Sequence, residues 1–396
     1  MVSTRSRPPL PRTVWVLGFV SLLMDLSSEI YHALLPAFIT VTLALPAVAL
    51  GAIDGVAEAT ASFAKLVSGR LSDRSMKRKP WIFAGYGLAA FSKPLFPLAT
   101  TGLLVMMARF FDRLGKGIRG APRDAMIADE TPPEVRGRAF GLRQGLDTVG
   151  ALLAPIAAVL LMLAFAGDIR TVFWIAIIPA AASVLLIVLA VREPEKHIAP
   201  KERQSLFGGF RNLGRQTKRV LAVGFLVMLA RFSEGFLILR GIDMGLSPAL
   251  SPLVLVLFNL SFVVLAYPAG ALSDSKNPRT LLAAGMAVLI AGNLVLSQDF
   301  GFAGLMVGVL LWGAHMALTQ GILARMVADS APEPLRATSF GAFYFVTGIA
   351  TLLASIAAGL IWDREGAAAT FIASAVVAAV AWAMLTLMPD ERPAAS

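Results

Sequence analysis

Long apolar runs, each about as long as a bilayer is thick, recur along the chain and are separated by short polar segments. A helix that crosses a membrane needs roughly 20 apolar residues and closes its own backbone hydrogen bonds. Continuous runs of Ala, Leu, Val and Gly do not resemble the alternating strands of a membrane β-barrel. We predict an all-α integral membrane protein with about twelve transmembrane helices. The spans are expected at 13–42, 47–71, 81–99, 102–127, 137–165, 171–191, 220–242, 249–273, 279–297, 301–327, 337–362 and 367–388.

The second half of the chain repeats the first. Met-x-Ala-Asp-x-x-Pro-x-x-x-Arg-x-x-x-Phe-Gly occurs at 126–141 and again at 326–341. Apolar composition alone does not place Asp, Pro, Arg and Phe-Gly in one register. Two six-helix repeat halves are typical of secondary transporters, which hold their substrate near the midplane between the halves. We predict an N-terminal half over 1–191, a basic cytoplasmic linker over 192–219 and a C-terminal half over 220–396.

Charge supports this membrane assignment and predicts its orientation. Hydrophobic residues make up 57% of the chain and charged residues 15%, so the net charge of +10 belongs to a membrane protein, not to a nucleic-acid binder. The basic residues gather in alternate loops and in the linker, which indicates that both termini are cytoplasmic in the inner membrane of the cell. There is no cysteine, which excludes disulfides and thiolate metal ligands.

The most charged stretch, 109–129, lies within an expected span. Arg109, Arg113 and Lys116 follow one another at spacings of four and three, so they form one cationic stripe on a helix, with Asp112 beside it. A soluble helix or a cytoplasmic loop is the alternative. Apolar residues from Leu103 to Met107 precede the stretch, and glycines at 115, 117 and 120 suit close helix packing. Both features favour a transmembrane helix whose charges face a cavity or acidic partners.

Acidic residues on neighbouring helices are candidates for proton coupling. Asp25, Glu29 and His32 share one face of the first helix, and two carboxylates so close favour holding a proton. The same three residues could ligate a divalent metal, although His32 is better explained as a solvated residue near the outer end of the helix. On the second helix, Asp54 and Glu58 are expected to neutralise the cations of the fourth helix.

The second half carries fewer charges in its expected spans. Glu234 corresponds to Glu29 in the repeat and would approach the same site, unless it pairs locally with Arg231. His315, on the counterpart of the charged fourth helix, is a candidate substrate residue or a hydrogen-bonded packing residue.

In the first half, Arg143 and Asp147 are one turn apart on the fifth helix and form a further possible pair.

The segment Gly69-Arg-Leu-Ser-Asp-Arg-x-x-Lys-Arg-Lys79 resembles the signature loop of the major facilitator superfamily. With Arg109 and the repeated Ala-Asp-Pro-Arg-Phe-Gly segment, the resemblance covers the whole chain. The amino-acid sequence of the charged stretch is similar to that of a prokaryotic subgroup of the superfamily. Some members of this subgroup are described as metal-resistance permeases. The chain departs from the superfamily's drug exporters where Asp112, Arg113 and Lys116 replace glutamine and small residues.

The resemblance implies alternating access, and the loop suggests how the cytoplasmic side is closed. Arginines of the loop can pair with acids of neighbouring helices, and its aspartate can sit at a helix N-terminus. A turn that merely sets topology is the alternative. The predicted latch residues are Gly69, Arg70, Asp73, Arg74 and Asp274.

The charged stretch indicates a polar cavity, and the resemblance implies that it serves proton-coupled export of a small solute. We expect a monomer in the bilayer that needs no cofactor. A divalent-metal exporter of the nickel or iron type, using Asp25, Glu29 and His32, is the alternative. The repeat disfavours a channel, and the chain has neither a HExxH nor a Gly-x-Ser-x-Gly motif of an intramembrane enzyme. It also lacks the phosphate-cradling loop of nucleotide hydrolases. The predicted coupling or substrate residues are Asp25, Glu29, Glu58, Arg109, Asp112, Arg113, Lys116, Glu234 and His315.

Overall fold

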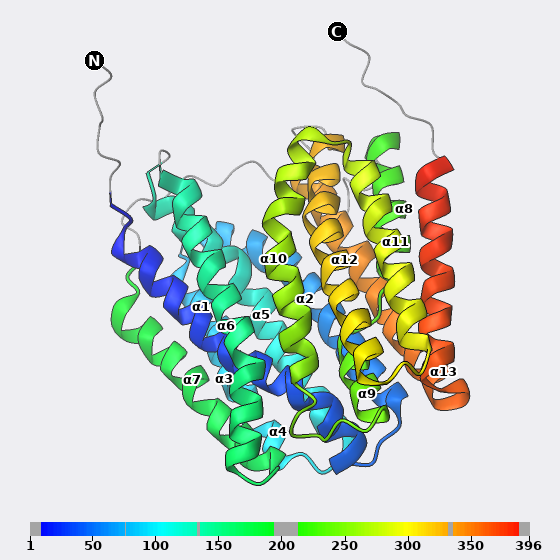
Figure 1. Ribbon diagram of the computed structural model, residues 1–396. Coiled ribbons are helices and arrows are strands. Elements are labelled where there is room, and N and C mark those ends of the chain that lie inside the picture. The colour runs from blue at the N-terminus through cyan, green and yellow to red at the C-terminus, as the bar shows by residue number, and fades with distance from the viewer. Residues whose placement is uncertain (1–8, 76, 133–134, 194–212, 332–335, 388–396) are drawn as a thin grey trace, which may run out of the picture. The chain divides into compact units, whose positions relative to one another are not determined.

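The computed structural model describes residues 9–75, 77–132, 135–193, 213–331 and 336–387, which form helices and no strands (Figure 1). The chain divides into two compact units. Unit 1 holds the residues up to 203 together with Glu234–Val256, and unit 2 holds the remainder.

The helices of unit 1 from α1 to α7 match the spans expected for the first half, and α9 comes from the span expected at 220–242. The bounds are α1 Arg12–Ala37, η1 Phe38–Thr42, α2 Ala47–Ser75, α3 Lys79–Ser92, α4 Leu95–Leu98, α5 Gly102–Glu130, α6 Arg136–Ala164, α7 Ile169–Ala190 and α9 Gly235–Asp243. The span expected at 81–99 is divided between α3 and α4, where Lys93 and Pro94 intervene. The first span continues from α1 into the π-helix η1.

Unit 2 contains the helices of the second half other than α9. They are α8 Arg215–Leu229, α10 Leu253–Ser275, whose first turn belongs to unit 1, α11 Pro278–Ser297, α12 Gly301–Ser330 and α13 Arg336–Leu387. The long α13 is interrupted at Gly366, whose φ of 84° is in the left-handed region. This interruption separates the two spans expected at 337–362 and 367–388. The span expected at 220–242 is interrupted between α8 and α9.

Eight helices among the described residues are long and apolar enough to cross a membrane. The charged α5 is not one of them, although it has 29 residues. Length and composition therefore support a multi-pass all-α membrane protein without reproducing the full count expected from the sequence.

Small residues bring α5 against its neighbours in unit 1. A Cβ added to Gly117 would lie 2.5 Å from the Ala64 Cβ of α2, and one added to Gly115 would lie 2.5 Å from the Gly85 oxygen of α3. These contacts confirm the expected close packing at 115 and 117, whereas Gly120 faces open space. The charged side chains of α5 are thereby held beside α2 and α3.

Candidate functional site

A buried ion-pair layer lies at the centre of unit 1. The Arg109 guanidinium on α5 lies 3.3 Å from a carboxylate oxygen of Asp54 on α2, as the sequence predicted. Asp112, one turn along α5, accepts a 2.8 Å hydrogen bond from the Lys93 ammonium. That ammonium also donates to the Ser28 hydroxyl of α1 at 2.8 Å. Helices α1, α2 and α5 and the junction between α3 and α4 are thus joined through polar groups that are removed from solvent.

Lys93 is a site residue that sequence analysis missed. Its side chain is fully buried, and its ammonium lies 4.8 Å from the ring centroid of Tyr31. A signal was present, because a lysine inside the apolar span expected at 81–99 must find a partner in a medium that does not solvate it. Its location between α3 and α4 brings it to the Asp112 carboxylate.

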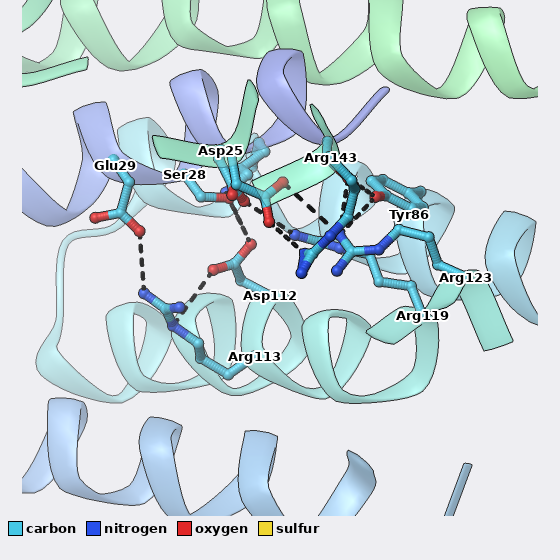
Figure 2. A network of polar contacts seen from close by, with 12 residues as sticks. Asp25, Ser28, Glu29, Tyr86, Asp112, Arg113, Arg119, Arg123 and Arg143 are labelled. Atoms are coloured by element: carbon cyan, nitrogen blue, oxygen red, sulfur yellow. Dashed lines mark hydrogen bonds and ion pairs between the residues drawn. The ribbon is translucent and has the colours of Figure 1, made fainter. Parts of the chain in front are cut away.

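A second, more accessible layer is centred on Arg113. Its guanidinium lies 4.0 Å from Glu29 of α1 (Figure 2). It also lies 3.5 Å from Glu58 of α2. The Glu29 side chain is 20% exposed and that of Glu58 is 48% exposed, in contrast to the nearly sealed Asp54 and Asp112. Both distances exceed the length of a hydrogen bond, and the Arg113 Nε makes none. Glu29 also lies 3.0 Å from His32 Nδ1.

The two acids of α1 pair with different arginines. The Asp25 carboxylate lies 3.5 Å from Arg119, whose guanidinium stacks 4.4 Å from the ring centroid of Tyr86 (Figure 2). Glu29 faces Arg113 instead. Asp25 and Glu29 share a helix face, as predicted, but each has its own cation. Arg119 belongs to the charged stretch seen in the sequence, yet it was not predicted as a site residue.

A third group of charges joins α5 to α6. Arg143 and Asp147 form the predicted pair at 2.5 Å on α6. Arg123 of α5 donates to the Ser21 hydroxyl at 2.8 Å, and its guanidinium lies 4.0 Å from Asp147. Because this group continues the layers above, charged contacts extend along much of α5 (Figure 2).

The described residues contain no group of three or more His, Asp or Glu side chains that could hold a metal ion. Asp25 contacts Arg119, while Glu29 contacts His32 and Arg113. Guanidinium groups beside both carboxylates oppose the binding of a cation by these acids. The structure therefore gives no support to the metal-ligand set expected from Asp25, Glu29 and His32.

The surroundings of the predicted latch residues lie outside the part of the structure that is described; these residues are Gly69, Arg70, Asp73, Arg74 and Asp274. Contacts around the same loop are described. Arg78 donates to the Ser72 hydroxyl at 3.0 Å, and its guanidinium lies 3.5 Å from Asp129 at the end of α5. The Glu193 carboxylate accepts the backbone N–H groups of Arg78 at 2.5 Å and Lys79 at 2.9 Å, at the start of α3.

The two predicted residues of the second half occupy different surroundings. Glu234 is half-buried just before α9, a helix of unit 1 that packs on α1. His315 is fully buried in unit 2, with Nδ1 2.9 Å from the Gly285 carbonyl oxygen. Nδ1 therefore carries the hydrogen, and Nε2 has no hydrogen-bond partner. The neighbouring Trp312 donates to Asn293 at 3.0 Å, in an otherwise packed core.

The sequence profile of the Major Facilitator Superfamily matches residues 17–240 and 220–396, which together span almost the whole chain. The chain belongs to the Major Facilitator Superfamily. The resemblance seen at the signature loop is thereby confirmed, and the protein is a multi-pass membrane transporter of this superfamily.

Relatives and solved structures agree with this assignment. An uncharacterised MFS-type transporter of Methanocaldococcus jannaschii is 29% identical over 383 residues, which cover 95% of this chain and 94% of the relative. The multidrug resistance protein MdtL of Escherichia fergusonii is 26% identical over 267 residues, covering 65% of this chain and 66% of MdtL. A crystal structure of the nucleoside transporter NupG superposes with a TM-score of 0.79 at 14% identity, over 94% of this chain and 99% of NupG, and so supports the fold alone.

Proposed function

We propose that this superfamily transporter exports a small solute in exchange for protons, and that the charged face of α1, α2 and α5 is its coupling site. The observation that carries the proposal is the position of Arg113 between Glu29 and Glu58. One cation lies beside two partly exposed carboxylates and is hydrogen-bonded to neither through its Nε.

Arg113 can exchange one carboxylate partner for the other at a low cost in free energy. If one carboxylate takes a proton, Arg113 keeps a charged partner in the other, so no guanidinium is left unpaired in a low-dielectric site. Water or solute must reach the exchanging acids, and the exposure of Glu29 and Glu58 satisfies this requirement. Asp54 and Asp112 are sealed from solvent and serve instead as fixed counter-ions.

Asp25 and Arg119 extend the coupling site towards α6. Their separation of 3.5 Å is again a loose pair, and Asp25 remains 16% exposed. We place proton exchange in the set formed by Asp25, Glu29 and Glu58. Arg109, Asp112 and Lys93 hold α5 in position behind it.

Orientation and gating complete the proposal. The loop charges support cytoplasmic termini in the inner membrane, and the motif repeated at 126–141 and 326–341 supports halves over 1–191 and 220–396. The ion pair of Arg78 with Asp129 supports a cytoplasmic latch that includes Asp73. Export is favoured because MdtL, a relative, is named for multidrug resistance.

Everted membrane vesicles that contain the protein test proton-coupled export. Respiration acidifies the vesicle interior, and a pH-sensitive acridine dye reports the gradient. A transported solute added outside should release protons from the interior and restore the fluorescence. The panel should contain organic cations, amphipathic drugs, divalent metals and amino acids, because the chain itself does not name a substrate.

Paired variants make the test specific. The double variant Glu29→Gln, Glu58→Gln should abolish the solute-dependent response, whereas Asp299→Asn, at an exposed site before α12, should retain it. A response equal to wild type in the double variant would place coupling elsewhere. If no panel member moves protons beyond vesicles that lack the protein, the proposal of proton exchange is wrong.

A further inference from the structure

Lys116 differs from the other cations of the α5 stripe. Its side chain is exposed, whereas Arg109 and Arg113 are buried. Among the described residues the Lys116 ammonium has no hydrogen bond or direct ion pair. It nevertheless interacts electrostatically with the carboxylates of Glu29 and Glu58. An exposed ammonium within a membrane transporter is costly to place in hydrocarbon, so we infer that this face of unit 1 is in contact with water.

Both signs of charge are therefore accessible on one face. Lys116 supplies an ammonium without a direct partner, and Glu58 supplies a carboxylate that is nearly half exposed. The two groups belong to α5 and α2, which pack closely through Gly117 and Ala64. Arg113, which lies beside Glu58, is three residues before Lys116 and so points to the same side of α5.

A second observation comes from hydrogen-bond donors behind this face. The Nε of Arg113 and the Nη1 of Arg119 are buried and have no hydrogen-bond acceptor. Both guanidinium groups lie beside carboxylates of α1, and Figure 2 shows them directed towards Glu29 and Asp25. Buried donors normally find an acceptor, and the carboxylate oxygens nearest to these guanidinium groups lie 3.5 Å or more away, so each donor is still able to hydrogen-bond an oxygen atom of a bound solute.

The charges restrict the kind of solute that fits. A simple cation would be drawn to the carboxylates but would also lie near Lys116. A simple anion would meet Lys116 but would also face Asp25, Glu29 and Glu58. A solute with both charges can pair each group with its opposite, which avoids leaving a desolvated charge without a partner.

We propose that this face binds a small zwitterion, with its anionic group at Lys116 and its ammonium group at Glu58 and Glu29. The inference rests on the proposed transport function and specifies its substrate class. Because Lys116 lies one helical turn from Arg113, the partner of Glu58, the two charges of the solute should be separated by about one turn, roughly 5 Å.

Equilibrium binding to the purified protein in detergent tests the inference without a proton gradient. The probes are three compounds of similar length that differ in charge, namely δ-aminovalerate, valerate and amylamine. A series from glycine to ε-aminocaproate then varies the charge separation. Thermal unfolding at rising probe concentration gives an apparent Kd, because a ligand that binds the folded state raises its stability. We expect δ-aminovalerate or a close neighbour in the series to stabilise the protein, and valerate and amylamine to have little effect.

Charge-neutralising variants should change selectivity in opposite directions. Lys116→Gln should weaken zwitterion binding by about tenfold or more and improve the relative binding of amylamine, because an unpaired cation is removed. Glu58→Gln should also weaken zwitterion binding and favour valerate. Lys276→Gln, an exposed lysine before α11 in unit 2, is the matched control and should bind as wild type. Opposite changes of selectivity are not expected from a general loss of folding.

The proposal is wrong if valerate or amylamine stabilises wild type as well as the zwitterions do, or if no zwitterion in the series stabilises it. Unchanged selectivity in Lys116→Gln would overturn it as well. These outcomes are separable from the vesicle assay. Proton exchange driven only by a drug or a simple cation would support the transport proposal and exclude the zwitterion site. Selective zwitterion binding without proton movement would support the zwitterion site and contradict proton-coupled transport.

Discussion

Replacing Lys93 with methionine should destabilise the protein, because the change leaves the Asp112 carboxylate buried without its nearest cation. The Lys93 side chain is 0% exposed and that of Asp112 is 2% exposed, and their charged atoms are 2.8 Å apart. Removing one member of a buried pair costs about 3–5 kcal/mol. Arg109 and Arg113 remain at 3.8 and 3.9 Å from Asp112 and offset part of the loss, so we expect about 3 kcal/mol.

The assay is the unfolding free energy of the purified protein in one detergent, from denaturant or thermal unfolding of wild type and variants. The double variant Lys93→Met, Asp112→Leu should recover part of the loss, because it removes the stranded carboxylate along with its partner. Lys276→Met serves as the exposed-lysine control. A loss below about 1 kcal/mol in Lys93→Met, the scale of an exposed pair, would refute the reasoning, as would a double variant less stable than Lys93→Met.

Three further predictions test the loop, the first helix and a helix cap. Asp73→Asn should keep the protein folded yet slow transport, if Asp73 belongs to the cytoplasmic latch; normal flux in vesicles would exclude that role. Asp25→Asn and Glu29→Gln should each uncouple solute movement from the pH gradient more than they lower protein abundance, and wild-type pH dependence in both would place coupling on other acids. Asp168 caps α7, and hydrogen bonds from the Thr171 hydroxyl and the following backbone lower the pKa of its carboxyl. This stabilisation should be complete above the carboxyl's unfolded pKa and be lost as pH falls through the lowered folded value, so stability curves of wild type and Asp168→Asn should converge in acid; parallel curves would contradict the cap.

Much of the site followed from local spacing. The cationic stripe of α5 and the acids of α2 were predicted to neutralise each other, and the ion pairs Arg109 with Asp54 and Arg113 with Glu58 confirm this. Residues three or four apart share a helix face whatever the tertiary structure, so spacing alone groups the charges on each helix.

The repeat and the apolar runs were equally local signals. They predicted the helices of both halves to within a few residues, because hydrocarbon permits only hydrogen-bonded helices of a given length. The break between α8 and α9 within 220–242 was not predicted, since the sequence there continues the apolar pattern on both sides.

The sequence by itself determined the all-α membrane class, the superfamily and the helices that carry charge. The tertiary structure decided which charges meet. Lys93 has no acid within one helical turn, and its partner Asp112 comes from another helix. Asp25 and Glu29 share a face, yet the packing of α1 on unit 1 gives them separate arginines. Pairing across helices depends on their rotation and depth, which are set by packing contacts such as Gly117 on Ala64 and not by the period of a single helix.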